Sequence, residues 1–176
     1  MISIMSGWQH IFDHAPLQYY EQGKTLFRRE DPVRSMYLVR SGAVALERPM
    51  EDGTALTLHV TDAGSALAEA SLFAEIYHCD AVTRSNCQIA VMPRAKFLLA
   101  LWDDPGAALS LIETHAREVQ AQRARIEILR LRRVSDRLDA WLDLYGEPKK
   151  GEWIAIADKI GVSPPALYRE LAKRKH

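Results

Sequence analysis

The pattern of this chain changes once along its length, from short strand-like runs to long helical ones. Up to about Met92 it consists of short stretches rich in β-branched and aromatic residues, separated by turn residues. The predicted strands include Met36–Val39, Ala43–Leu46, Leu56–Val60 and Ile89–Met92. Short strands at a spacing of roughly 8 to 12 residues favour a closed β-sandwich or roll over a parallel sheet with crossover helices.

Turn residues punctuate this part of the chain. Glycines at positions 23, 42, 53 and 64 follow strand-like runs, and Glu51-Asp52-Gly53-Thr54 is typical of a hairpin tip. The sequence therefore predicts antiparallel neighbours joined by short connections.

A helical pattern begins at Pro105, which follows two acids as a first helical residue often does. One long helix and a shorter one, Val134–Tyr145, are predicted. A heptad frame on the long helix predicts a parallel homodimer, and its seam consists of Ile112, His115, Val119, Gln122, Ile126 and Leu129. Because two seam residues are polar, an ordinary amphipathic helix lying on the β domain is the alternative.

The segment from Trp153 to Leu171 has the pattern of a helix-turn-helix. Small Ala157 lets two helices cross closely, Gly161 permits a left-handed turn, and Ser163 is a natural N-cap for the second helix. The exposed side chains predicted to contact double-stranded DNA are Ser163, Tyr168, Arg169, Lys173 and Arg174. A purely structural helical hairpin is the alternative.

Charge is divided unevenly along a chain whose net charge is zero. From Arg117 to the end there are 14 Lys and Arg against nine Asp and Glu, a net charge of +5, so the preceding part carries −5. Such a division indicates a polyanionic partner at the basic end, or else a solvated helix face.

Composition excludes several classes of protein. Two cysteines cannot form a disulfide scaffold in a chain of 176 residues, and no apolar run approaches the roughly 18 to 20 residues of a membrane span. The N-terminus lacks a secretory signal pattern, so we expect a reduced, cytoplasmic protein. The phosphate-loop, serine-hydrolase and zinc-protease motifs are missing, and we expect no enzyme activity.

Three stretches carry a family resemblance: Tyr20–Pro32, Met36–Val44 and Ala68–Phe73. With the helical pattern that follows, they resemble the cyclic-AMP receptor protein/fumarate-nitrate regulator (CRP/FNR) family of bacterial transcription factors. The resemblance implies an α+β chain, with a sensory β-roll of the jelly-roll or double-stranded β-helix type over residues 1–104. A dimerisation helix over 105–133 and a helix-turn-helix domain over 134–176 would follow. The implied partners are a second copy, double-stranded DNA and RNA polymerase.

The sequence departs from the family at the ligand site. Where cyclic-nucleotide-binding members have Gly-Glu and Arg-Ser-Ala, this chain has Ala68-Glu69 and Cys79-Asp80-Ala81. Loss of the phosphate-binding Arg disfavours cyclic AMP, and the lack of N-terminal cysteines disfavours an iron-sulfur cluster. The effector pocket implied by the resemblance contains Glu69, Cys79, Asp80, Gln122 and Arg123, with Arg123 as a substitute for the lost positive charge.

Three interpretations of Tyr77-His78-Cys79-Asp80 stay open. In the first, Cys79 is a small buried core residue and His78 lies on the surface. In the second, His78 and Cys79 are candidate ligands for haem or a metal, with His59 or His115 as second ligands. In the third, the pocket binds an organic effector. Strand alternation points His78 and Cys79 to opposite faces, which argues against joint chelation. A ligand, haem, metal or redox sensing module without specific DNA binding is the alternative function.

The DNA reader also departs from the family. Pro164 and Pro165 stand where the family has a base-reading Arg and Glu, so we expect a different operator sequence. The chain ends at His176, before the β-hairpin wing of the family, so we expect fewer phosphate contacts and weaker binding.

Overall fold

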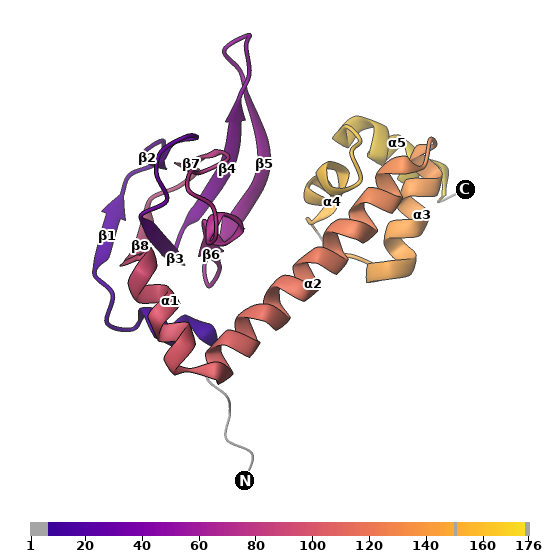
Figure 1. Ribbon diagram of the computed structural model, residues 1–176. Coiled ribbons are helices and arrows are strands. Elements are labelled where there is room, and N and C mark those ends of the chain that lie inside the picture. Colours follow the sequence, from indigo (N-terminus) through magenta and orange to yellow (C-terminus); the bar gives the residue numbers. More distant parts are fainter. Residues whose placement is uncertain (1–6, 150, 175–176) are drawn as a thin grey trace. The chain divides into compact units, whose positions relative to one another are not determined.

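A computed structural model describes residues 7–149 and 151–174. The chain forms two compact units, Met1–Ile112 and Glu113–His176, and each is described by itself (Figure 1). Within the described residues there are eight strands and five α-helices. None of these helices combines the length and the apolar character that crossing a membrane would require.

The first unit is built on two four-stranded antiparallel sheets. One sheet has the order β1-β8-β3-β6 and the other the order β2-β7-β4-β5. The strands are β1 (Leu17–Tyr20), β2 (Thr25–Phe27), β3 (Ser35–Ser41), β4 (Ala43–Pro49), β5 (Ala55–Asp62), β6 (Ala66–Leu67), β7 (Asp80–Thr83) and β8 (Cys87–Pro93). Each predicted strand lies inside one of these, so the predicted closed β architecture is confirmed.

The interior of this roll is filled by side chains from both sheets. Leu38, Val44, Leu67 and Ile89 are at most 1% exposed. Burying one such aliphatic side chain stabilises the fold by about 1.5 to 3 kcal/mol. The hydrophobic core therefore fixes which strand faces point inward, and with them the positions of the polar side chains at the strand ends.

The longest hairpin connects β4 and β5 through the predicted tip. Pairing runs from Ala43 opposite Asp62 to Pro49 opposite Ala55. At the tip, the Asp52 carboxylate accepts a hydrogen bond from the Thr54 N–H, with an Oδ1–N distance of 2.9 Å. This local turn chemistry confirms the hairpin prediction.

A helix that the sequence analysis did not predict, α1 (Arg94–Asp103), directly follows β8. Its Phe97 is buried, and the Phe97 ring contacts Phe12 of the 3-10 helix η1 (Trp8–Phe12) with 5.4 Å between ring centroids. Leu98 and Leu101 pack on the same core. The helical spacing of these apolar residues could have predicted α1, but the Asp103-Asp104-Pro105 break directly after them obscured that signal.

Asp104 separates α1 from the next helix and caps that helix. Its Oδ1 accepts the Ala107 N–H at 2.9 Å, and its Oδ2 lies 3.0 Å from Nε2 of His10. The hydrogen bond from Ala107, followed by the contact with His10, holds the pKa of this carboxyl below its ordinary value of 3.8. A carboxyl with a lowered pKa contributes stability above its ordinary pKa, and this contribution is lost as pH falls through the folded value.

We expect Asp104→Ala to lose that acid-sensitive contribution. The difference in unfolding free energy between the native chain and the variant should be largest near neutral pH and should shrink as the pH falls below 3.8. Urea unfolding from about pH 7 to about pH 2.5 measures this difference. Asp104→Asn, which retains an acceptor oxygen without a titrating charge, is the control, and a pH-independent difference for Asp104→Ala would contradict the assignment.

The second unit is helical. α2 (Pro105–Arg130) begins in the first unit, and α3 (Val134–Tyr145), α4 (Trp153–Lys159) and α5 (Pro164–Lys173) follow. The core of the second unit consists of Ile128, Leu138, Trp141, Ile156, Ala157, Ile160 and Leu167. The predicted long helix, second helix and helix-turn-helix are therefore all present, with α2 ending at Arg130.

Candidate nucleic-acid interface and effector pocket

The turn between α4 and α5 has the predicted geometry. Gly161 has a φ of +65°, and a Cβ at this position would lie 2.6 Å from Cδ2 of Leu129. Only glycine meets both demands without strain. Ser163 is the N-cap of α5, since its hydroxyl accepts the Ala166 N–H, and Pro164 and Pro165 occupy the first turn, where a missing N–H costs little.

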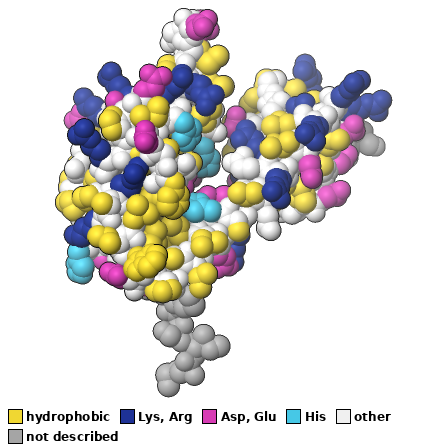
Figure 2. Space-filling view, viewed as in Figure 1, with side chains coloured by type: hydrophobic (Ala, Val, Ile, Leu, Met, Phe, Trp, Pro, Cys, Tyr) yellow, Lys and Arg dark blue, Asp and Glu magenta, His cyan; other side chains and the backbone are white. Residues whose placement is uncertain are grey.

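α5 buries one face and exposes a polar, basic one. Leu167 is fully buried and Leu171 packs on the same core, whereas Tyr168 and Arg169 are exposed. Figure 2 shows several Lys and Arg side chains on the visible face of this unit. Leu167 and Leu171 thus form the inward face of α5, and its outward face carries polar and basic side chains.

Basic side chains of α5 and of the α3 N-terminus meet around one cavity. Its volume is about 420 Å³, and Arg133, Ser135, Arg169 and Lys173 are among its lining residues. The acid in its lining, Glu170, lies 3.6 Å from Nζ of Lys173. The sequence analysis missed Arg133 and Ser135, because only the packing of α3 against α5 places them beside Arg169. Two guanidinium groups beside a helix N-terminus can hold a phosphate.

Arg174 is engaged within the protein. Its guanidinium lies 2.7 Å from the Asp139 carboxylate and 3.7 Å from that of Glu170, and it donates to the Ser135 carbonyl at 3.1 Å. These bonds connect α5 to α3. A DNA contact by Arg174 would have to compete with them, so its predicted role in DNA binding remains a prediction.

Arg137 is a structural residue that the sequence analysis did not single out. Its guanidinium donates to the carbonyl oxygens of Leu129 and Leu131 at the end of α2, and to those of Ile160 and Gly161 after α4. Carbonyls at helix C-termini lack intrahelical partners and attract cations. One side chain thus joins the long helix to the turn of the helix-turn-helix.

Three of the predicted effector-pocket residues belong to the first unit. Glu69 starts the short 3-10 helix η2 (Glu69–Ser71), Asp80 begins β7, and Cys79 directly precedes it. Ala68 has a φ of +71°, a left-handed conformation that costs a non-glycine residue about 1 to 2 kcal/mol. Ala68 therefore adopts the left-handed backbone conformation that suits the glycine of the family motif, although the residue is no longer glycine.

Cys79 is a buried thiol and Asp80 is a structural acceptor. Burial, followed by the charges of Asp80 and Glu69, raises the pKa of the Cys79 thiol, so it is protonated near neutral pH and weakly nucleophilic. The Asp80 carboxylate accepts the Arg29 N–H at 2.6 Å. Asp80 therefore anchors the loop after β2.

The candidate metal ligands do not gather. Cys79 is buried, whereas His78 is exposed and its Nδ1 lies 3.1 Å from Oγ of Ser71. His59 is on β5, and His115 on α2 contacts Glu118 at 2.8 Å. In the part of the chain that the structure describes, no three His, Cys, Asp or Glu side chains are placed to hold a metal ion.

The predicted seam on α2 is largely solvent-exposed. Ile112, Val119 and Ile126 are 62%, 49% and 50% exposed, and Leu129 is 37% exposed. Gln122 and Arg123 are also exposed on α2, in the second unit, so their membership of the effector pocket remains a prediction.

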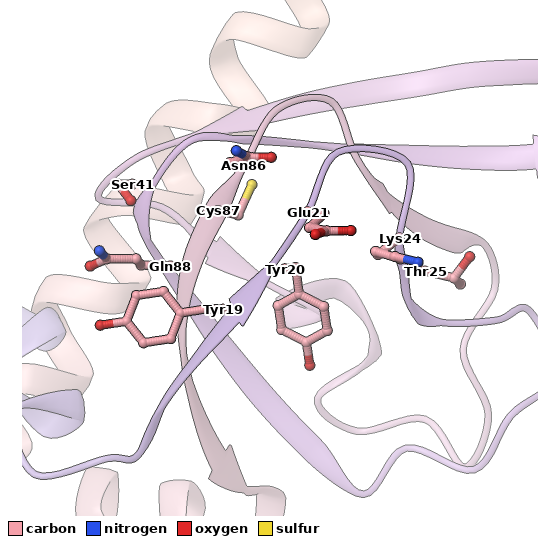
Figure 3. A pocket seen from close by; sticks show the side chains of 9 residues that line it. All are labelled: Tyr19, Tyr20, Glu21, Lys24, Thr25, Ser41, Asn86, Cys87 and Gln88. Atoms are coloured by element: carbon pink, nitrogen blue, oxygen red, sulfur yellow. The ribbon is translucent and has the colours of Figure 1, made fainter.

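A larger cavity, of about 760 Å³, lies at another place on the roll (Figure 3). Residues from β1, β2, β3, β8 and the turns beside them line it, and none of them was predicted as a site residue. Its charged residues are one acid, Glu21, and one base, Lys24, while the Cys87 thiol donates to the Ala43 carbonyl. The lining therefore does not select a ligand charge.

Comparison with known proteins finds a family model for part of the first unit and relatives that cover most of the chain. Residues 17–102 match the family model of the cyclic nucleotide-binding domain. The global nitrogen regulator of Synechococcus elongatus is 28% identical over 172 residues, which cover 88% of this chain and 77% of that protein.

Solved structures show the same fold. The c-di-GMP-responsive global regulator CLP of Xanthomonas campestris has a TM-score of 0.65 and 22% identity, over 95% of this chain and 89% of its own. The catabolite activator protein of Thermus thermophilus has a TM-score of 0.56 and 21% identity, over 94% and 80%. Residues 17–102 are therefore similar to the cyclic nucleotide-binding domain, and the chain has the fold of these two regulators, which agrees with its resemblance to the CRP/FNR family.

Proposed function

We propose that this protein is a homodimeric, sequence-specific DNA-binding transcription regulator whose β-roll senses an effector. The observation that carries this proposal is the basic cavity of the second unit, where Arg133, Arg169 and Lys173 surround one space beside an exposed α5. These side chains suit phosphates flanking a major groove that α5 enters. RNA polymerase is the further partner we expect, and we assign no catalytic role.

The apolar seam of α2 supports the homodimer. Ile112, Val119 and Ile126 recur every seven residues and are each about half exposed or more. Exposed apolar side chains at heptad spacing on a helix are the pattern that a second identical helix covers, knobs into holes. Polar His115 and Gln122 in the same seam would fix the register of the two helices.

The dimer connects sensing with DNA binding. A dimer can place two α5 helices in successive major grooves when they lie about 34 Å apart, one turn of DNA. An effector that binds one arrangement of the dimer more tightly than the other shifts the population toward it. Binding in residues 17–102 would in this way change DNA affinity.

Selection from random-sequence duplexes tests this function. We expect the purified protein to enrich an inverted repeat whose half-sites are centred about 10 base pairs apart. The variant Val119→Asp/Ile126→Asp, which places charges in the seam, should sediment as a monomer and bind the selected duplex without cooperativity. A wild-type monomer, or no enrichment of any sequence, would contradict the proposal and favour a sensing module that does not read DNA.

A further inference from the structure

A cavity of about 500 Å³ in the first unit has two arginines and a histidine in its lining. Its lining residues are Arg29, Glu30, Arg48, Ile76, Tyr77 and His78. This volume is in the range of small-molecule sites. The sequence analysis singled out only His78 among the charged or titratable members.

The two arginines are poorly neutralised. The Arg48 guanidinium, near the end of β4, makes no hydrogen bond or ion pair with any residue that the structure describes, and its charge acts on Cys79. Arg29 pairs only with the adjacent, exposed Glu30 among the described residues, at 3.5 Å. Among the lining residues, two guanidinium groups stand against the single carboxylate of Glu30, and the Asp80 carboxylate, which accepts the Arg29 N–H, is a second acid nearby.

The backbone around the cavity is fixed before any ligand arrives. The Glu30 N–H donates to the Tyr77 carbonyl and the Tyr77 N–H to the Asp31 carbonyl, each at 2.9 Å. The Tyr77 ring stacks on Phe27 with 3.9 Å between centroids. Glu30 itself has a φ of +73°, a conformation that costs a non-glycine residue free energy and that clusters at ligand sites.

His78 adds an imidazole, which can donate from Nε2 when that nitrogen carries the proton. Its Nδ1 is 3.1 Å from Oγ of Ser71, which is 1% exposed, so the ring is oriented by a buried hydroxyl. The other ring nitrogen, Nε2, makes no hydrogen bond with the described residues and is available to a ligand. A rigid site with two guanidinium groups and an imidazole matches the oxygens of a phosphoryl group.

We infer that Arg29, Arg48 and His78 bind the phosphoryl group of a small phosphate monoester, and that this ligand is the effector of the regulator. Positive charge from β4 and from the loop after β2 then takes the place of the Arg that Cys79 has replaced. Exposed Ile76 offers an apolar wall for the organic part of the ligand. The inference that the cavity binds a phosphoryl group depends on this geometry alone, whereas the inference that the ligand is an effector rests on the proposed function.

Calorimetric titration of the full chain with ribose 5-phosphate and with inorganic phosphate, at constant ionic strength, tests the binding. We expect saturable binding of the monoester, and binding of inorganic phosphate alone would identify the free anion as the ligand. Arg48→Gln should weaken the binding at least tenfold and Arg29→Gln severalfold. Arg34→Gln, an exposed arginine outside the cavity lining, should leave it unchanged.

Two results would overturn the inference. One is the lack of saturable binding of either phosphate at millimolar concentration, and the other is equal affinity in wild type and Arg48→Gln. Circular dichroism confirms that the variants are folded. In the regulatory arm, saturating monoester should change the affinity for the selected duplex at least fivefold. An unchanged DNA affinity with intact phosphate binding refutes the effector role only, and a failed DNA selection refutes only the proposed function.

Discussion

Replacing Arg137 with alanine is expected to lower the free energy of unfolding of the second unit by about 2 to 3 kcal/mol. The guanidinium makes four hydrogen bonds to main-chain carbonyls, with distances of 2.7 Å to Leu131, 3.0 Å to Gly161 and 3.2 Å to Leu129 and Ile160. Hydrogen bonds to a charged group contribute about 1.5 to 3 kcal/mol each when buried. Arg137 is half-buried, so water replaces part of what alanine removes.

Hydrogen exchange of the α4 and α5 amides measures this destabilisation where it occurs. Protection of the Ile160 and Leu167 amides should fall by one to two orders of magnitude, as about 1.4 kcal/mol per factor of ten requires. Arg132→Ala is the matched control, because Arg132 is exposed and five positions away. Equal protection in Arg137→Ala and Arg132→Ala would show that the four bonds are not needed for the turn.

The double variant Arg133→Ala/Arg169→Ala is expected to bind its selected duplex about 10- to 100-fold more weakly than the wild type. Both guanidinium groups line the 420 Å³ cavity and neither has a described ion-pair partner, so their charge is available to a phosphate. For every DNA phosphate that the variant no longer neutralises, the slope of log K against log salt should also become shallower by about 0.9.

Gel-shift titrations between about 50 and 200 mM salt give both quantities. Arg34→Ala/Arg40→Ala, which removes the same charge from exposed positions of the first unit, is the control and should retain the wild-type salt slope. A double variant with wild-type affinity and slope would place the DNA surface elsewhere on the molecule.

The predictions that succeeded rest on short-range chemistry. Ser163 caps α5, Gly161 adopts its left-handed turn, and Asp52 closes the β4–β5 hairpin, because each depends on residues within a few positions. The strands were predictable for the same reason, since β-branched runs between turn residues are a local signal.

What escaped prediction depends on contacts between distant segments. In the sequence, Arg137 is only one of several charged residues on an amphipathic helix. Its role depends on the carbonyls of Ile160 and Gly161, which the fold places beside it. Arg48 is far along the chain from the other members of its cavity, and only strand pairing brings it there. Periodicity shows which face of an element is polar, but not what that face meets.

The two prolines at the start of α5 have a consequence for how a groove would be read. Their rings carry no amide hydrogens, and the Ala166 N–H is already taken by Ser163. The leading tip of the helix therefore presents methylene surface in place of polar donors. In a DNA complex such a tip recognises thymine methyl groups and duplex shape, so exchanges between G·C and C·G pairs beneath it should be discriminated less sharply than substitutions that remove a thymine methyl group.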